Sequence, residues 1–360
     1  SGLPKYLNNK RSEDIWKSRG PNNQGGRTRA IALDINNSNI ILAGSATGGI
    51  YKSTDAGQTW TKANCPANAI TCIIQDTRVG KTNIWYAGTG ELSGSSGTAT
   101  GAYYYGQGIF KSIDGGNTWS VIPFTNGGST TSFDSDFDGV WNIAIDYSNA
   151  NQDEIYAATY GGIYKTTDGG LNWKKKRSGA LPNYSYYTDV AVDKQGVVYA
   201  TMSSESTQKG IWRSVDGEAW ISITPTGFPS VYGRMCIGIA PSDQNQVYIV
   251  ASGTTNFGFV SANFQGTKEW NSLWKYTFIS GDGKSSGGLW ENRSDNLPAL
   301  GGVFGDLVVQ QGYDLVVKYH PIDTNIVFIG GTNLYRSSNA FRNSSGISWI
   351  GGYMPNTKRP

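Results

Sequence analysis

The segment GGIYKSTDAGQTW, residues 48–60, decides the fold because the chain repeats it. Residues 49–52 alternate between apolar and polar side chains, which predicts a half-buried strand. Ser53, Asp55 and Gly57 then predict a tight turn, since Ser and Asp accept nearby backbone hydrogen bonds and Gly tolerates a positive φ. Trp60 begins a returning strand and offers a large apolar ring to a neighbouring layer. Related segments follow at residues 106–119 (GQGIFKSIDGGNTW), 161–173 (GGIYKTTDGGLNW) and 209–220 (KGIWRSVDGEAW).

A second pattern precedes these segments and completes a four-stranded unit. Two strands joined by a turn rich in Asp and Asn are expected at residues 31–44, 143–159 and 317–330, with no helical periodicity between the strands. Tandem four-stranded units are the blades of a β-propeller, in which each blade covers an apolar face of the next. We therefore predict an all-β β-propeller of four-stranded antiparallel blades, a single domain over residues 1–360.

Tryptophans on the expected outer strands mark six blades, and the turn pattern decays in the last two. In unit five Tyr276 stands where the turn serine belongs, and in unit six Asn339 replaces the turn aspartate. Asn also accepts backbone hydrogen bonds, so we expect a hairpin there as well. The six tryptophans are Trp60, Trp119, Trp173, Trp220, Trp290 and Trp349.

The turn resembles the Asp-box, also called the BNR repeat, of sialidases, sortilin-type receptors and xyloglucan-hydrolysing propellers. Residues 53–60 and 112–119 meet the full pattern Ser-x-Asp-x-Gly-x-Thr-Trp, and residues 166–173 nearly meet it. Such turns are hairpins at the end of the blade opposite the usual ligand face. The repeated aspartates, Asp55, Asp114, Asp168 and Asp216, are therefore expected to be scaffold residues whose side chains are occupied by the turn.

Residues 15–21 (IWKSRGP) read as a lone outer strand of a ring-closing blade that lacks its other three strands. We expect from this that the intact protein has at least one further blade beyond Pro360, seven or more in total. The alternative is a closed six-bladed ring with a decorated N-terminus.

Composition is that of an aromatic, turn-rich β-protein with 48 Gly, 12 Trp and 21 Tyr but only 16% charged residues. A net charge of +3 gives no basic stripe, and the single cluster KKKR at residues 174–177 is expected on a solvated outer strand, so nucleic acid is not an expected partner. No segment approaches the roughly 20 apolar residues of a membrane helix.

The cysteines and the single histidine give little chemistry. Cys65 and Cys72 are close enough in sequence to form a disulfide in an oxidising compartment, whereas Cys236 reads as an unpaired core residue. His320 occupies a turn position equivalent to Asp34 and is expected to serve the turn. One histidine excludes a multi-histidine metal centre and makes a Ser-His-Asp triad improbable.

Ligands of propellers usually bind to the face formed by the loops between the second and third strands and by the connections between blades. Two long loops, residues 88–108 and 252–270, supply aromatic and polar side chains to that face, and others begin inner strands. Such residues suit a protein or glycan ligand, although the aromatics could instead cover the base of their own loops. The candidate ligand-binding residues are Arg27, Glu91, Tyr103, Tyr105, Tyr187, Asp189, Arg234 and Trp270, with Arg29, Tyr186 and Asp314 as further polar or aromatic candidates.

The segment DSDFDGVWN, residues 134–142, is a candidate calcium loop. Asp134, Asp136 and Asp138 place carboxylates at alternate positions before a glycine, and hard oxygen ligands in such a loop suit Ca²⁺. The segment resembles the calcium loop of integrin α propellers, with Asn142 in place of the final aspartate. The alternative is an acidic surface turn that binds no metal.

For function, the sequence favours a secreted or cell-surface binding or adhesion scaffold without a catalytic constellation. Sialidases carry an Arg-Ile-Pro motif, an arginine triad and a Tyr/Glu pair, and the Arg-Ile-Pro string is absent here. Xyloglucan-hydrolysing members place a catalytic aspartate in the first blade where residues 43–53 carry no carboxylate. The alternative is a sialidase-like or xyloglucanase-like glycoside hydrolase, for which Glu91, Asp189 and Glu205 could supply the two carboxyls that such enzymes generally need.

The sequence also resembles large exported proteins of Bacteroidota at residues 20–34, 43–55 and 106–116. In those proteins a sortilin-like propeller precedes adhesive modules and a type nine secretion signal. This resemblance implies an extracellular or cell-surface protein that has the type nine export machinery as a partner.

Overall fold

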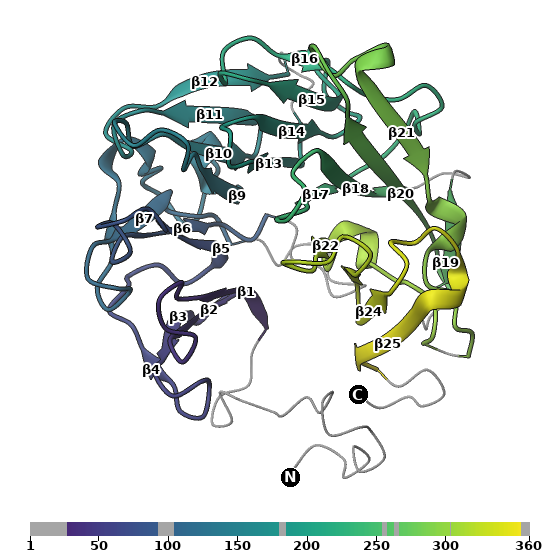
Figure 1. Ribbon diagram of the computed structural model, residues 1–360. Helices are drawn as coiled ribbons and strands as arrows, with labels where there is room; N and C mark the ends of the chain where they lie inside the picture. Colours follow the sequence, from purple (N-terminus) through teal and green to yellow (C-terminus); the bar gives the residue numbers. More distant parts are fainter. Residues whose placement is uncertain are drawn as a thin grey trace.

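A computed structural model describes residues 27–92, 104–179, 185–253, 258–262, 266–302 and 304–353. Six antiparallel sheets are arranged around a common centre, and within each sheet the chain runs from the innermost strand outwards (Figure 1). Each sheet has four strands except the fifth, which has five. The predicted all-β propeller of four-stranded antiparallel blades is confirmed, with six blades in the described part of the chain.

The first three blades follow the predicted repeat. Blade one comprises β1 (Thr28–Leu33), β2 (Ile41–Ser45), β3 (Gly49–Ser53) and β4 (Thr61–Lys62). Blade two comprises β5 (Ile70–Gln75), β6 (Trp85–Thr89), β7 (Ile109–Ser112) and β8 (Ser120–Val121). Blade three comprises β9 (Val140–Ile145), β10 (Ile155–Thr159), β11 (Gly162–Thr166) and β12 (Lys174–Ser178).

The last three blades contain the one departure from the plain repeat. Blade four comprises β13 (Thr188–Val192), β14 (Val198–Met202), β15 (Gly210–Ser214) and β16 (Ile221–Ser222). Blade five comprises β17 (Met235–Ile239), β18 (Gln246–Gly253), β19 (Phe259–Ala262), β20 (Lys268–Phe278) and β21 (Gly288–Asn292). Blade six comprises β22 (Val316–Tyr319), β23 (Val327–Gly330), β24 (Asn333–Ser337) and β25 (Ile347–Gly352).

Blade five corrects the expectation of a plain loop over residues 252–270. β18 and β20 pair from Gln246 with Thr277 to Gly253 with Trp270, and β19 adds to the far part of β20. The hairpin of β18 and β20 is therefore longer than those of the other blades, and β19 adds a further strand at its outer end. Short 3-10 turns complete the structure: η1 (Pro123–Thr125), η2 (Asp136–Asp138), η3 (Ser285–Gly287), η4 (Ser294–Asn296), η5 (Gln310–Gly312) and η6 (Ser344–Gly346).

Apolar layers between successive blades form the core of the described residues. In the first layer, Leu42 and Ile50 of blade one pack with Trp85 and Phe110 of blade two. Equivalent layers separate each later pair of blades. Each sheet thus buries its apolar side chains against its neighbours, which is why one blade cannot be stable alone.

The repeated turn has the hydrogen bonds that the sequence predicts. Asp55 accepts hydrogen bonds from the backbone N–H of Thr59 (2.8 Å) and the Ser53 hydroxyl (2.8 Å), while the Ser53 Oγ accepts one from the Gly57 N–H (2.8 Å). Gly57 has φ 82°, which favours glycine. The Trp60 indole N–H donates to the Gly57 carbonyl at 3.1 Å. The aspartate is therefore a scaffold residue, as predicted.

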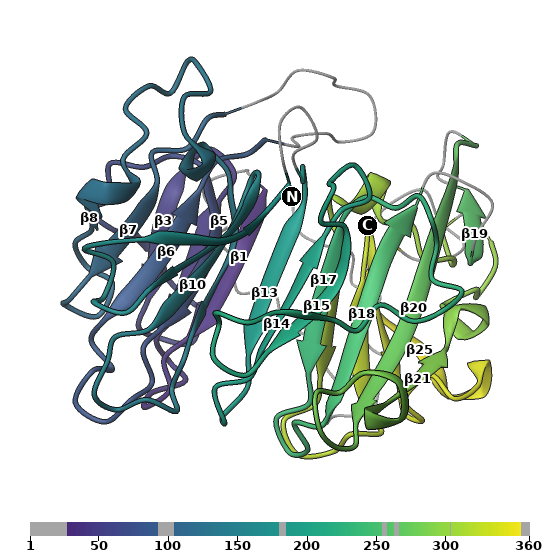
Figure 2. The same ribbon diagram turned by 90° about the horizontal axis from the view of Figure 1, so that it is seen from above.

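The basic residue of each repeated segment links one blade to the next, a role that the sequence did not reveal. Lys52 Nζ donates to the Gly115 carbonyl in the turn of blade two at 2.9 Å, and Lys165 Nζ donates to the Asp216 carbonyl of blade four at 2.7 Å. Arg213 donates to the Asp282 carbonyl of blade five at 3.3 Å. The turns thus form a chain of contacts along one edge of the ring. Seen edge-on, the loops and turns that connect the strands lie along two opposite edges of the molecule (Figure 2).

Several smaller expectations can be compared with the structure. Cys65, Cys72 and Cys236 are all free thiols, so the possible disulfide between Cys65 and Cys72 is not formed. His320 Nδ1 accepts the N–H groups of Ile322 (3.4 Å) and Asp323 (3.3 Å), the turn role expected for it. The lone strand expected at residues 15–21 lies outside the described residues. Within the described ranges, no helix has the length and hydrophobicity needed to cross a membrane.

Candidate functional site

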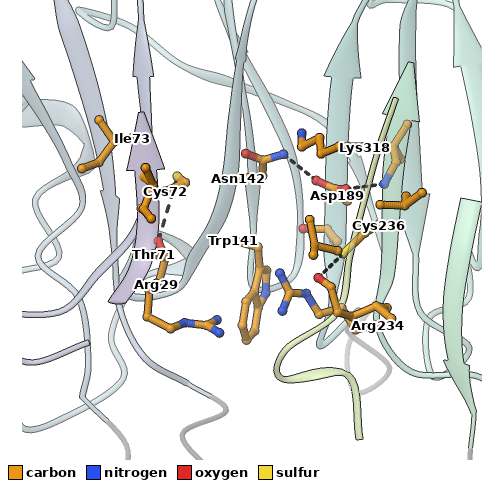
Figure 3. Close-up of a pocket in the computed structure, with 17 residues that line it drawn as sticks. Arg29, Thr71, Cys72, Ile73, Trp141, Asn142, Asp189, Arg234, Cys236 and Lys318 are labelled. Atoms are coloured by element: carbon orange, nitrogen blue, oxygen red, sulfur yellow. Dashed lines mark hydrogen bonds between the residues drawn. The ribbon is translucent and has the colours of Figure 1, made fainter. Parts of the chain in front are cut away.

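The innermost strands of all six blades surround a cavity of about 300 Å³ at the centre of the ring (Figure 3). Every blade contributes to its lining, because each inner strand begins beside the centre. One lining residue from each blade in turn is Arg29, Thr71, Asn142, Asp189, Cys236 and Lys318.

A buried carboxylate, Glu91, lies where blade two meets this centre. Its side chain is held by the Tyr313 hydroxyl, which donates to Oε1, and by Arg27 (3.7 Å) and Arg29 (3.4 Å) as ion pairs. Glu91 is only 2% exposed. The preceding Gly90 has φ 106°, and a Cβ there would lie 2.0 Å from the Asp138 carbonyl oxygen, so only glycine fits.

Two guanidinium groups meet on one backbone oxygen. The Tyr313 carbonyl accepts hydrogen bonds from Arg29 Nη1 (2.8 Å) and Arg234 Nη1 (3.0 Å). The Arg29 guanidinium also lies 4.1 Å from the centre of the Tyr313 ring, a cation–π contact. Burial, with repulsion from Arg234, lowers the pKa of Arg29. Figure 3 shows Arg29 and Arg234 pointing toward each other beside Trp141 at one end of the cavity.

The segment that carries Tyr313 is a strained turn supported by blade five. Gln310 and Gln311 in η5 have φ values of 48° and 58°, unusual for residues other than glycine. Glu269 of β20 accepts the N–H groups of Val309 (2.8 Å) and Gln311 (3.1 Å). The lengthened hairpin of blade five therefore fixes the turn that presents Tyr313 to the centre.

The two central aspartates have different surroundings. Burial raises the pKa of Asp189, and its carboxylate accepts hydrogen bonds from Asn142 Nδ2 (2.7 Å) and the Ile237 N–H (2.8 Å). It thus ties blades three, four and five together. Burial also raises the pKa of Asp314, while Arg29, Arg234 and Arg27 oppose the shift. Within the described ranges, the Asp314 carboxylate accepts no hydrogen bond, and its charge interacts with the three arginines.

An aromatic wall adjoins the arginines. The Trp141 indole N–H donates to the Tyr186 carbonyl at 2.9 Å, and the Tyr187 ring lies 5.2 Å from the Trp141 ring. Arg234 lies 5.8 Å from the Trp141 ring centre. Aromatic faces beside a few convergent polar groups are typical of a small-molecule or sugar site.

The structure brings together part of the predicted set. Arg27, Glu91 and Arg234 meet at the centre, and Tyr187 and Asp189 adjoin it. Tyr105 lies on the loop of blade two, outside the cavity lining, and Tyr103 lies outside the described residues. Trp270 lies in β20 beside Glu269, and it is Glu269 that supports the turn at Tyr313.

Tyr313, Trp141 and Glu269 were missed in the sequence. The available signal was position: Arg29, Arg234 and Asp314 all stand at or just before the start of an inner strand, and so do Trp141 and Tyr313. Of these residues, Arg29, Trp141 and Arg234 line the central cavity. No local signal marks Glu269, which acts through a turn 40 residues away.

The four candidate calcium ligands do not share one site. Asp138 accepts the N–H groups of Asp134 (2.7 Å) and Ser135 (3.0 Å), whereas Asp136 pairs with Lys175 at 2.6 Å. Asn142 lies in the central cavity. Among the described residues, no group of three or more His, Cys, Asp or Glu side chains is arranged to hold a metal. Calcium binding stays a prediction, which the melting temperature with and without a chelator would check.

Comparison with known proteins gives sequence relatives among polysaccharide-degrading enzymes. No protein-family model matches the chain. It is 26% identical over 269 residues to the xyloglucanase Xgh74A of Acetivibrio thermocellus, covering 64% of this chain and 29% of that protein. It is 30% identical over 221 residues to a xyloglucanase of a Paenibacillus species, covering 56% of this chain and 21% of that protein. The chain therefore spans less than a third of the length of these relatives.

Solved structures share the fold. A GH74 enzyme of Niastella koreensis superposes with a TM-score of 0.60 at 21% identity, over 89% of this chain and 46% of that one. An ancestral GH74 enzyme gives 0.64 at 20% identity, over 90% and 41%. YCF48 from Cyanidioschyzon merolae gives 0.53 at 13% identity, over 90% and 84%. At these identities the likeness establishes the propeller fold alone.

These relatives correct the main functional expectation. The sequence favoured a binding or adhesion scaffold without catalytic residues. That leading interpretation is wrong, because the sequence relatives are named xyloglucanases. The alternative, a glycoside hydrolase, is the better supported interpretation.

Proposed function

We propose that the chain is the propeller of a glycoside hydrolase that cuts a xyloglucan-type polysaccharide outside the cell. The observation that carries this proposal is the sequence similarity to xyloglucanases over more than half of the chain. The centre of the ring supports it, because Arg29, Arg234 and Trp141 line the cavity, and Glu91 pairs with Arg29 beside it.

Two carboxyls of this cluster suit the two roles that glycosidic hydrolysis requires. Asp314 is the candidate general acid, since burial raises its pKa, the direction in which an acid stays protonated near neutral pH. Glu91 is the candidate second carboxylate, since Arg27, Arg29 and the Tyr313 hydroxyl fix its orientation. One carboxyl would protonate the leaving oxygen while the other activates water on the opposite face of the sugar. Both stand beside Tyr313.

Turnover of tamarind xyloglucan, followed as new reducing ends, tests this proposal. Glu91→Gln and Asp314→Asn should each lower kcat by about a hundredfold or more, the usual cost of losing an acid or base. Asp295→Asn, an exposed residue of η4, is the matched control and should leave kcat unchanged. Failure of the unaltered chain to cut xyloglucan or any other member of a polysaccharide panel would refute the proposal.

A second candidate is sialidase-like hydrolysis, favoured by the Tyr313–Glu91 hydrogen bond beside three arginines. Sialidases use a tyrosine nucleophile, and Glu91 is placed to accept the Tyr313 proton as the phenol oxygen attacks the sugar. Here Tyr313→Phe would abolish cleavage of a sialyl-lactose substrate. Cleavage of xyloglucan that survives Tyr313→Phe would instead support the first candidate.

We further propose that the chain reaches the cell exterior through type nine export, consistent with a polysaccharide substrate too large to enter the cell. Detection of the protein only in the cytoplasm of its host would contradict this.

A further inference from the structure

An aromatic ridge runs along the loop face from blade two to blade four. We define it as Tyr105, Phe133, Tyr160 and Tyr186, whose successive ring centres are 6.2, 4.9 and 5.4 Å apart. Tyr105 and Tyr160 lie between the second and third strands of blades two and three. Phe133 and Tyr186 lie in the connections that lead into blades three and four. Segments distant in sequence thus place four rings in one line.

The ridge is partly open to solvent. Phe133 is 39% exposed and Tyr186 is 46% exposed, whereas aromatic rings in the layers between blades, such as Trp85, are fully buried. Exposed apolar rings that form a continuous line mark an interaction site more often than isolated ones do. Neighbouring rings are tilted by 53° to 67°, so the surface is stepped instead of flat.

The ridge leads directly to the central cavity. The Tyr186 carbonyl accepts the Trp141 indole hydrogen bond, and the next ring, Tyr187, packs against Trp141. Trp141 lines the cavity beside Arg234. A ligand lying along the ridge would therefore reach the cavity at Trp141 and Arg234.

The charges near the ridge favour a neutral ligand. Asp136 and Glu205 are the carboxylates whose charges act on Tyr160, and Lys175 is already paired with Asp136 at 2.6 Å. Lys175 also lies 5.3 Å from the centre of the Tyr164 ring. An anionic polymer would therefore meet the negative charges of Asp136 and Glu205 near the ridge.

We propose that the aromatic ridge binds an extended, neutral polysaccharide chain and guides it into the central cavity. Ring faces take the apolar C–H faces of successive sugars, and the tyrosine hydroxyls bond to sugar hydroxyls at the rim. A stepped line of single rings, each separated by about one sugar unit, suits an extended chain better than a flat planar ligand. This inference rests on the proposed hydrolase function and names the face through which its substrate binds.

Affinity electrophoresis of the whole chain in gels containing tamarind xyloglucan tests the ridge. Phe133→Ala combined with Tyr186→Ala should weaken retention by about tenfold, the order expected when central aromatic contacts are truncated. When Tyr186→Trp replaces Tyr186→Ala in the double variant, the ring is kept and most of the retention should return. Tyr353→Ala is the matched control, because Tyr353 is 37% exposed but lies after β25, on blade six. Melting temperatures of all variants verify folding, and Phe133→Ser replaces the double variant if that does not fold.

The outcomes separate this inference from the proposed hydrolase. Ridge-dependent retention without turnover would support the ridge and refute the hydrolase. Turnover with unchanged KM and retention in the double variant would refute the ridge and leave the hydrolase standing. Equal loss in the Tyr353→Ala control, or stronger retention in polygalacturonate gels than in xyloglucan gels, would overturn the ridge as a site for neutral chains.

Discussion

At the scale of single residues, the central carboxyls show how one cavity can assign different tasks to chemically similar groups. Asp189 is occupied by donors from blades three and five, which leaves it no free role toward a ligand. Asp314 is half-buried and its charge interacts with Arg29, Arg234 and Arg27. Glu91 is held from both sides by Arg27 and Arg29. The surroundings of each carboxyl, and not its residue type, distinguish the structural Asp189 from the candidate catalytic pair, Asp314 and Glu91.

Asp189→Ala should destabilise the protein by about 2 kcal/mol, because it removes the acceptor of three N–H donors, those of Asn142, Val190 and Ile237. Asp189→Asn, which keeps an acceptor oxygen, should cost less. Urea denaturation of both variants measures this difference. If Asp189→Asn abolished turnover without changing stability, Asp189 would be a catalytic residue and not a brace.

At the scale of structural elements, the repeated segment does two jobs. Its aspartate closes the turn within a blade, and its basic residue bonds to the next blade, as in the contact of Lys165 with the Asp216 carbonyl. Lys165 is buried and also pairs with Glu154 at 2.9 Å. Adjacent blades are therefore coupled by polar contacts at the edge as well as by apolar layers.

Lys165→Met should destabilise the protein by about 3 kcal/mol, because it leaves the buried Glu154 without its cation. Lys174→Met on the exposed outer strand is the control and should change the free energy of unfolding by less than about 0.5 kcal/mol. Chemical denaturation compares the two. An equal effect in both variants would show that the contact between blades is unimportant.

At the scale of the whole molecule, the aspartate turns along one edge give the ring a common dependence on pH. Hydrogen bonds from Thr59 and Ser53 lower the pKa of Asp55 to about 2. Burial opposes the same shift in Asp114 and Asp168, but hydrogen bonds from Thr118, and from Thr166 and Asn172, outweigh it and lower both pKa values to about 2. Carboxyls in an unfolded chain titrate near about 4. These turns therefore stabilise the fold fully above that pH and lose their contribution as pH falls toward about 2.

A triple variant, Asp55→Asn, Asp114→Asn and Asp168→Asn, should have a lower melting temperature than the unaltered chain at pH 6. The difference should shrink as pH falls from about 5 to about 2, because these aspartates take up protons at about pH 4 in the unfolded chain but only at about pH 2 in the native one. Thermal unfolding followed by circular dichroism at several pH values measures it. A difference independent of pH would contradict the role given to these carboxylates.

The sequence by itself determined the blades, because strand alternation, turn residues and the outer tryptophan are local patterns repeated six times. It also identified Arg29, Glu91, Arg234 and Asp314 as candidates for the ligand face, since each stands at the edge of an inner strand or loop. Their partnership could not be predicted. Arg29 and Tyr313 are 284 residues apart, and Glu91 and Tyr313 are 222 apart.

Only the tertiary structure decided which residues form the site and which hold the fold. Arranging six sheets around one centre brings their inner strands together, and that convergence depends on blade packing instead of local pattern. The same packing separated the expected calcium ligands, placing Asn142 in the cavity and Asp136 against Lys175. It also aligned the four rings of the aromatic ridge from four separate connections. Local chemistry therefore specified the repeating unit, and the arrangement of the six blades around one centre specified the site.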